Sequence, residues 1–269
     1  MSSLPISLHF AHANGFPSGS YRYLFSHFPA HWHLHALPKF GHTARFPISQ
    51  NWHNQRDELV EHIEQDIQPQ KPIFLVGHSF GAIVSYMAAC QLKDRIAGLI
   101  MLDPPLVTGV SRMIIRFAKQ SSLIDKLTRA DLAEARKTAW SVEEDVFAYF
   151  QGKALFKDFH HESLLDYVRA NTIESPQGKV LNFDNRVEAA VFRNIPHDLN
   201  RYTGELTCPS MIVTGTQTDI CVPRLRNRFI RANKMAHAEV EGGHMFPLEY
   251  PEQTAKIIQR TVEKWAISA

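Results

Sequence analysis

The chain has 269 residues, a formal net charge of +2 and 15 histidines counted as neutral. Hydrophobic residues make up 44% of it and charged residues 21%, which is ordinary for a globular protein and unlike a disordered one. Lysine and arginine are scattered rather than clustered, so nucleic acid and acidic membrane surfaces are poor candidates for partners.

The chain begins with MSSLPISLHF, which lacks the basic segment and long apolar run of a targeting signal. No later apolar run approaches the ~20 residues that a membrane-spanning helix needs. The three cysteines, Cys90, Cys208 and Cys221, form no C-x-x-C pair, and their odd number suits a reducing compartment. We therefore expect a cytoplasmic protein with no membrane span.

Short apolar segments, several of them bounded by glycine or proline, predict β-strands. In chain order they are Leu4–Phe10, His33–Phe40, Pro72–Val76, Arg95–Asp103, Pro209–Thr214 and His237–Glu241. Helical patterns fall between them, at Asn51–Ile67 with Asn51 as its cap, Phe80–Leu92, Pro223–Ala232 and Pro251–Trp265. This alternation predicts a parallel sheet with helices on both faces.

The histidine-rich stretch HWHLH, residues 31–35, raises the question of a metal site, because alternate residues of a strand share a face. No carboxylate or cysteine accompanies these histidines at a recognisable ligand spacing. We therefore predict a surface strand here and no metal site.

One region breaks the alternation of strand and helix. From Pro105 to Ile195 we find helical patterns and no convincing strand, which predicts a helical lid at 105–195, inserted into a core formed by 1–104 and 196–269. The lid's aromatic residues suit packing over a site: Phe117, Trp140, Phe147, Tyr149, Phe150, Phe156, Phe159 and Tyr167.

Residues 76–81 read VGHSFG, between a predicted strand and a predicted helix. In so sharp a turn, side chains in place of Gly77 and Gly81 would clash with neighbouring backbone, and Ser79 would project above the sheet edge. The Phe80 N–H, at the start of the helix, could then donate to an oxyanion. Ser79 is the candidate nucleophile, and His78 is expected to pack against the turn or brace it.

A serine hydroxyl is a weak nucleophile, so it needs a base within hydrogen-bond reach and an acid that orients the base. His244, in the glycine-rich segment EGGHMFPLEYPE after the last predicted strand, is the best-placed base. Two aspartates follow predicted strands: Asp219 in PSMIVTGTQTDICVP and Asp103 in RIAGLIMLDPP. We favour Asp219 as the acid and keep Asp103 as the alternative.

The G-H-S-x-G turn, the helical insertion, the strand followed by G-x-x-x-D and the G-G-H segment together resemble the α/β-hydrolase superfamily. This resemblance implies an α/β-hydrolase fold with the triad order Ser, Asp, His. Only Met1–Ser3 precede the first predicted strand, so the superfamily's first two strands look absent. We expect about six mostly parallel strands in the order 4-3-5-6-7-8 of the superfamily's numbering, with a crevice beside Ser79.

The resemblance also implies a second oxyanion donor in the stretch HFAHANGFPSGSY, residues 9–21. Alignment on His12 gives the Asn14 N–H, whereas alignment on Gly15 gives the Phe16 N–H. Both assignments stay open.

Serine in the turn implies acyl chemistry, because the similar dehalogenases and epoxide hydrolases attack through a carboxylate. We favour a carboxylesterase that cleaves small to medium esters without a cofactor, and expect a homodimer only as a base rate. Thioesterase, lactonase and perhydrolase activities stay open. The main alternative is a carbon–carbon bond hydrolase. Such enzymes usually have an arginine for the substrate's carboxylate, and Arg112, Arg116 and Arg193, which flank the insertion, could serve this role or be solvated. A non-catalytic ligand-binding protein is the alternative of another class.

Overall fold

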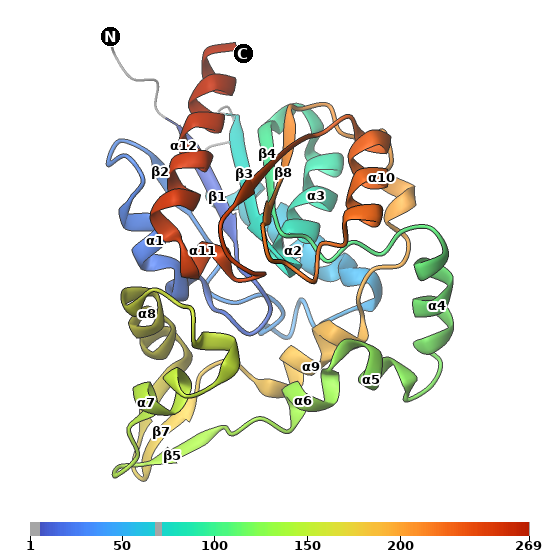
Figure 1. The fold of residues 1–269 in the computed structure, drawn as a ribbon. Coiled ribbons are helices and arrows are strands. Elements are labelled where there is room, and N and C mark those ends of the chain that lie inside the picture. Colours follow the sequence, from blue (N-terminus) through green and yellow to red (C-terminus); the bar gives the residue numbers. More distant parts are fainter. Residues whose placement is uncertain (1–5, 68–71, 269) are drawn as a thin grey trace.

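A six-stranded sheet forms the centre of the computed structural model, which describes residues 6–67 and 72–268 (Figure 1). Every neighbouring pair of strands is parallel. The order is β2 (His33–His35), β1 (Ser7–Ala11), β3 (Ile73–His78), β4 (Ile96–Leu102), β8 (Ser210–Gly215) and β9 (Ala236–Val240). This confirms the expected order, in which the chain reverses direction between β1 and β3.

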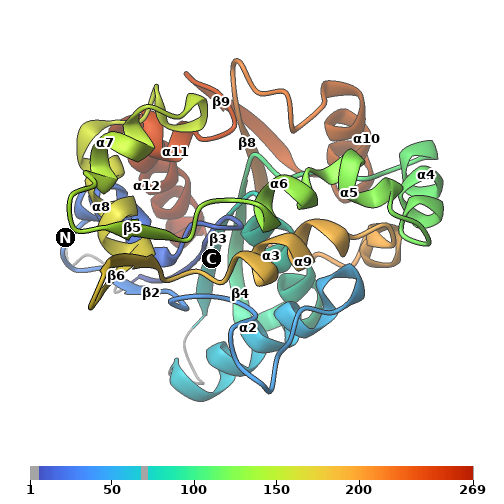
Figure 2. The same ribbon diagram turned by 90° about the horizontal axis from the view of Figure 1, so that it is seen from below.

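Helices cover both faces of the sheet (Figures 1 and 2). One face carries α2 (His53–Asp66), α3 (Phe80–Leu92) and α10 (Pro223–Asn233). The other carries α1 (Arg22–Ser26) and α12 (Pro251–Ser268). The short helix α11 (Phe246–Glu249) comes just before α12. In the stretches 6–67 and 72–268, no helix combines the length and the apolar character needed to cross a bilayer.

Burial on both faces explains the continuous apolar runs in the strands. All six residues of β3 are buried, and successive side chains point to opposite faces of the sheet. Leu75 therefore packs in the cluster that includes α2 and α3, whereas Val76 packs in the cluster that includes α1 and α12.

The segment between β4 and β8 forms a layer over the carboxyl ends of the strands (Figure 1). Its helices are α4 (Val110–Ala118), α5 (Leu123–Thr128), α6 (Ala130–Glu134), α7 (Val146–Gln151), α8 (His161–Asn171) and α9 (Asn185–Arg193). It also contains an antiparallel sheet of β5 (Ala139–Ser141), β7 (Gly178–Leu181) and β6 (Thr172–Ser175). The expectation of an insertion without strands is therefore wrong, because strands of three or four residues are too short to show alternation.

Two local expectations also differ from the structure. The predicted strand His33–Phe40 is limited to β2, and Pro38 lies within the missing part, where it could donate no ladder hydrogen bond. Asn51 does not cap α2; instead the Ser49 hydroxyl accepts from the Asn54 N–H at 2.8 Å. The predicted residues Leu4 and Pro5 of the first strand lie outside the described residues.

Candidate active site

Ser79 lies in the turn between β3 and α3 in a strained backbone conformation. Its φ of 54° and ψ of −117° fall outside the regions that residues with a side chain ordinarily adopt. The turn is packed tightly, since a Cβ on Gly81 would lie 2.2 Å from the Ala11 carbonyl oxygen and one on Gly77 would lie 2.3 Å from the Gly81 carbonyl oxygen. Both glycines are therefore required sterically, as the sequence predicts.

The imidazole of His244 lies between Ser79 and a carboxylate. Its Nε2 is 2.9 Å from Ser79 Oγ, and its Nδ1 is 2.5 Å from Asp103 Oδ2. Asp103 is fully buried at the end of β4, whereas 20% of the His244 side chain is exposed. The Nδ1–H tautomer donates to Asp103 and leaves Nε2 to accept the proton of the Ser79 hydroxyl.

The sequence favours Asp219 as the acid, but the carboxylate within hydrogen-bond distance of His244 is that of Asp103. Asp219 is exposed, and no hydrogen bond in the described part of the chain joins it to His244. The loop after β8 contributes Thr218 instead, whose hydroxyl donates to Asp103 Oδ2 at 2.6 Å. Strands β4 and β8 are neighbours, so both aspartates reach the same edge of the sheet, and the strand pattern alone does not separate them.

His78 braces the turn, as expected. Its hydrogen-bond partner is Tyr21, which the sequence does not indicate. The Ala13 N–H donates to Tyr21 Oη at 3.2 Å, and the Tyr21 hydroxyl donates to His78 Nδ1 at 2.8 Å. His78 Nε2–H donates in turn to the His244 carbonyl oxygen at 2.9 Å. Burial lowers the pKa of His78 well below its usual value, and the nearby His244 lowers it further. A neutral imidazole thus joins the Ala13 loop to the backbone of His244.

His12 fixes the same loop from its other side. His12 Nδ1–H donates to the Ala13 carbonyl oxygen at 2.8 Å, and Nε2 accepts from the Phe40 N–H at 3.0 Å. Burial lowers the pKa of this imidazole to about 4, so it is neutral at ordinary pH. His12, the residue on which one alignment of this loop rests, therefore helps to fix the backbone next to Asn14.

The candidate oxyanion donors differ in whether their N–H groups are already used. The Phe80 N–H opens α3 and has no acceptor within that helix. The Phe16 N–H donates to the Ala13 carbonyl oxygen at 3.1 Å in a tight turn. The Asn14 N–H has no acceptor among the described residues, and its side-chain amide donates to the Glu188 carbonyl oxygen at 2.9 Å.

Aromatic packing attaches the insertion to this loop. The Phe16 ring contacts those of Phe156, Phe159 and Tyr167, with centroids 4.9 to 6.1 Å apart. The Tyr167 hydroxyl accepts from the Arg136 guanidinium at 2.8 Å. Three of the insertion's aromatic residues therefore pack against this loop. Phe117 on α4, by contrast, is 64% exposed.

The described residues offer no evident ligand set for a metal ion. Across 6–67 and 72–268, no group of three or more histidine, cysteine, aspartate or glutamate side chains is arranged to hold one. His33 and His35 belong to β2, at the edge of the sheet.

A parallel sheet with a strained serine between strand and helix, hydrogen-bonded to a histidine, is the arrangement typical of α/β hydrolases. The chain belongs to the α/β hydrolase family, whose sequence profile, described as "Alpha/beta hydrolase family", matches residues 10–257.

Individual relatives are distant in sequence. The abhydrolase domain-containing protein AFT2-1 of Alternaria alternata is 23% identical over 228 residues, which cover 72% of this chain and 84% of that protein. The peroxisomal alpha-beta-hydrolase Lpx1 from Saccharomyces cerevisiae has a TM-score of 0.81 at 12% identity, covering 99% of this chain and 78% of Lpx1. E-2-(acetamidomethylene)succinate hydrolase has a TM-score of 0.78 at 19% identity, covering 97% and 92%. The two solved structures support the fold alone.

Proposed function

We propose that the protein is a serine hydrolase that cleaves carboxylic esters. The observation that carries this proposal is the chain of hydrogen bonds from Asp103 through His244 to Ser79, with distances of 2.5 and 2.9 Å. A serine hydroxyl within reach of a histidine that a buried carboxylate orients is the arrangement that activates serine for attack on a carbonyl carbon.

In this mechanism His244 Nε2 takes the proton of Ser79 Oγ as the oxygen attacks the ester carbonyl. Asp103 stabilises the imidazolium that forms, and His244 then gives the proton to the departing alcohol. Water, deprotonated by His244, then attacks the acyl carbonyl carbon. The bond between this carbon and Ser79 Oγ breaks, His244 returns the proton to Oγ, and the carboxylic acid is released.

The tetrahedral oxyanion is stabilised by the N–H groups of Phe80 and Asn14. The positive end of α3 supports the first donor. We assign the second to Asn14 rather than Phe16, because the Phe16 N–H already donates to the Ala13 carbonyl oxygen at 3.1 Å. Two donors held by a braced backbone would stabilise the oxyanion without reorganisation.

The substrate we propose is a small to medium ester with an apolar group. Phe16 belongs to the loop that supplies the oxyanion donor, and it packs against Phe156 and Phe159 of the insertion. Apolar side chains beside a few convergent polar groups are typical of sites for small molecules.

The alternative of a carbon–carbon bond hydrolase calls for an arginine beside the triad that can bind the substrate's carboxylate. Arg193 is paired with Asp125 and Glu134, at 2.7 and 2.5 Å. Arg136, whose partner Tyr167 contacts Phe16, is itself paired with Glu188 at 2.5 Å. Neither of these guanidinium groups is free for a substrate carboxylate. Arg112 and Arg116 line a pocket that includes none of Ser79, His244 and Asp103, so we retain the ester hydrolase.

The proposal is tested by steady-state hydrolysis of p-nitrophenyl butyrate by the wild type and by Ser79→Ala. We expect kcat/KM to fall by at least ~10³-fold in the variant, because the nucleophile is lost while the fold is kept. A vinylogous 1,5-diketone from aromatic-ring cleavage serves as the comparison substrate. Equal ester turnover by Ser79→Ala, or turnover of the diketone alone, would contradict an ester hydrolase.

A further inference from the structure

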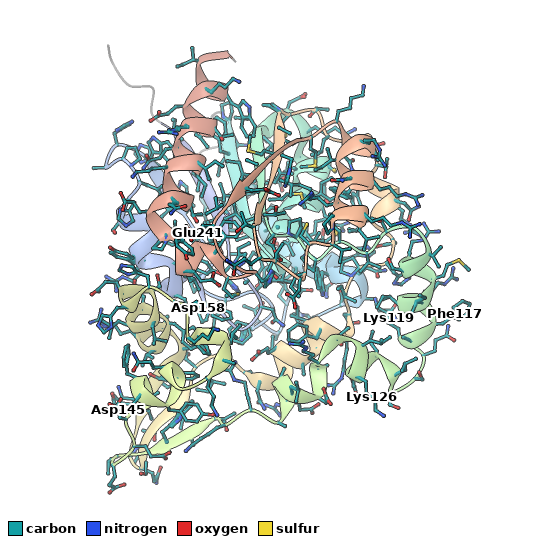
Figure 3. All side chains as sticks on the ribbon, in the orientation of Figure 1. Phe117, Lys119, Lys126, Asp145, Asp158 and Glu241 are labelled. Atoms are coloured by element: carbon teal, nitrogen blue, oxygen red, sulfur yellow. The ribbon has the colours of Figure 1, made fainter. Side chains whose placement is uncertain are left out.

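Helix α4 is amphipathic, but its apolar side faces outward. Four of its apolar side chains are each more than half exposed: Val110, Met113, Ile114 and Phe117. Phe117 lies at the outer edge of the molecule in Figure 3. The basic residues Arg112 and Arg116, and Lys119 just after the helix, line a pocket towards the protein body. A surface helix ordinarily turns its charges to solvent. Here Arg112 and Lys119 are half-buried, and Arg116, although exposed, also lines the pocket.

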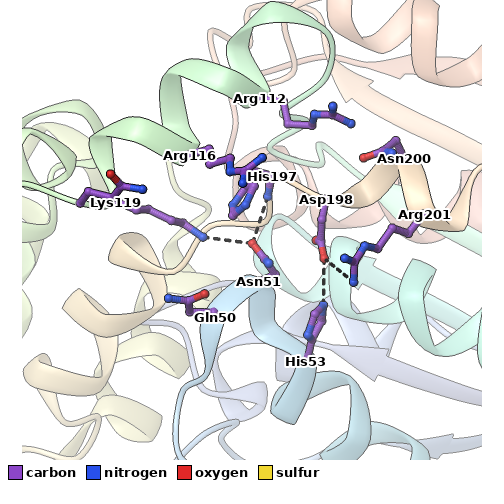
Figure 4. A pocket seen from close by; sticks show the side chains of 11 residues that line it. Gln50, Asn51, His53, Arg112, Arg116, Lys119, His197, Asp198, Asn200 and Arg201 are labelled. Carbon is purple, nitrogen blue, oxygen red and sulfur yellow. Dashed lines mark hydrogen bonds and ion pairs between the residues drawn. The ribbon is translucent and has the colours of Figure 1, made fainter.

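This basic face closes a pocket of about 510 Å³. Figure 4 shows its walls, which come from α4, from the segment 50–53 before and at the start of α2, and from residues 197–201. Among its lining residues, Arg112, Arg116, Lys119 and Arg201 carry positive charge, whereas Asp198 is the sole carboxylate. The lining includes none of Ser79, His244 and Asp103, so the pocket is separate from the candidate triad.

The polar groups within the pocket are only partly paired. Asp198 Oδ2 is 3.2 Å from His53 Nε2 and 3.9 Å from an Arg201 guanidinium nitrogen. Asn51 Oδ1 accepts from Lys119 Nζ at 3.1 Å.

Arg112 and Arg116, by contrast, make no hydrogen bond or ion pair with any residue in 6–67 or 72–268. Two guanidinium groups therefore keep all their donors available beside the pocket.

Positive charges around the pocket affect the imidazole of His197. Burial lowers the pKa of His197, and Lys119, Arg116 and Arg112 each lower it further, while Asp198 opposes them. His197 Nδ1 is buried and has no partner among the described residues. Burial also lowers the pKa of Lys119 to about 8. An anion in the pocket would offset this mutual repulsion and could accept hydrogen bonds from these groups.

We propose that this pocket binds the phosphate group of a small phosphorylated molecule. A phosphate carries up to two negative charges and accepts hydrogen bonds in several directions, which suits cationic groups that arrive from different elements. A planar carboxylate is matched by a single guanidinium fork and would leave the second one unpaired. The pocket volume leaves room for the organic part of the ligand. This inference does not depend on the proposed role of Ser79.

Isothermal titration calorimetry at constant ionic strength, with pyrophosphate as the probe, tests the pocket. We expect saturable binding that weakens at least tenfold when Arg112→Gln and Arg116→Gln are combined, because two unpaired guanidinium groups are removed. Arg260→Gln is the matched control, because Arg260 is an exposed arginine of α12 on the opposite face of the sheet. The affinity of this variant for pyrophosphate should stay within twofold of the wild type. Thermal unfolding of each variant checks that the fold is retained.

No saturable binding, an equal loss in Arg260→Gln, or malonate binding as tightly as pyrophosphate would overturn the proposal. The source of the phosphate is resolved by p-nitrophenyl butyrate hydrolysis with added pyrophosphate. Competitive inhibition that disappears in the double variant supports a phosphate carried by the substrate. Saturable binding without inhibition supports a separate phosphorylated ligand. Inhibition that persists in the double variant contradicts the pocket.

Discussion

Asp103 receives two hydrogen bonds on one carboxylate oxygen. His244 Nδ1–H and the Thr218 hydroxyl donate to Oδ2 at 2.5 and 2.6 Å, and the side chain is fully buried. Charge-assisted hydrogen bonds in a buried site are short and strong. Thr218 thus helps to fix the carboxylate that, in our proposal, orients the base.

Substitution of each aspartate by asparagine separates the two candidates. Asp103→Asn should lower kcat for p-nitrophenyl butyrate by about 10³–10⁴-fold, because an amide favours the wrong tautomer of His244. Asp219→Asn, the control at an exposed position, should stay within about threefold. Near-normal turnover in Asp103→Asn together with a large loss of turnover in Asp219→Asn would show that Asp219 orients His244.

At the scale of elements, the strand-to-helix turn could be predicted because its constraint is local. Gly77 and Gly81 are needed by contacts that a turn of this type always makes, so the sequence alone indicates Ser79. The choice between the aspartates depends on how β4 and β8 lie side by side, which apolar runs do not encode. The pairing of His78 with Tyr21 joins residues 57 positions apart and leaves no local signal.

The close approach at Gly81 predicts a large loss of stability in Gly81→Ala. The added Cβ would meet the backbone oxygens of Ala11 and His12 at 2.2 and 2.6 Å, and backbone cannot move aside as a flexible side chain does. We expect the free energy of unfolding in urea to fall by at least about 3 kcal/mol.

Gly152→Ala is the matched control, since its nearest neighbour would be 3.5 Å away and its φ is −73°. It should change stability by less than about 0.5 kcal/mol. Equal stability of the two variants would contradict the tight turn.

For the whole molecule, the buried histidines dominate the expected response to acid. His9, His12 and His78 are fully buried, and burial is the main cause of the lowered pKa of each. Below about pH 6.5 these histidines bind protons in the unfolded chain but not in the folded state, so their contribution to folding stability is complete above that pH and falls on acidification. Glu58 acts in the opposite sense, because burial raises its pKa to about 7.

We therefore predict that the free energy of unfolding in urea falls between pH 6.5 and 5. His9→Leu should flatten this slope by up to roughly 1.4 kcal/mol per pH unit, the contribution of one proton. Neither ring nitrogen of His9 has a partner among the described residues, so the leucine should not destabilise the protein at pH 7.5. An unchanged slope in His9→Leu would contradict a neutral, buried His9.

The role of Ser79 as the nucleophile is tested most directly by covalent labelling with a fluorophosphonate, in which the serine oxygen displaces fluoride from phosphorus. Intact-mass measurement should show one adduct per chain, and peptide mapping should locate it on Ser79. Labelling should be absent in Ser79→Ala and slowed by at least ~10²-fold in His244→Ala, because the base is removed. Labelling of Ser79→Ala at the wild-type rate, or an adduct on another residue, would contradict the proposed mechanism.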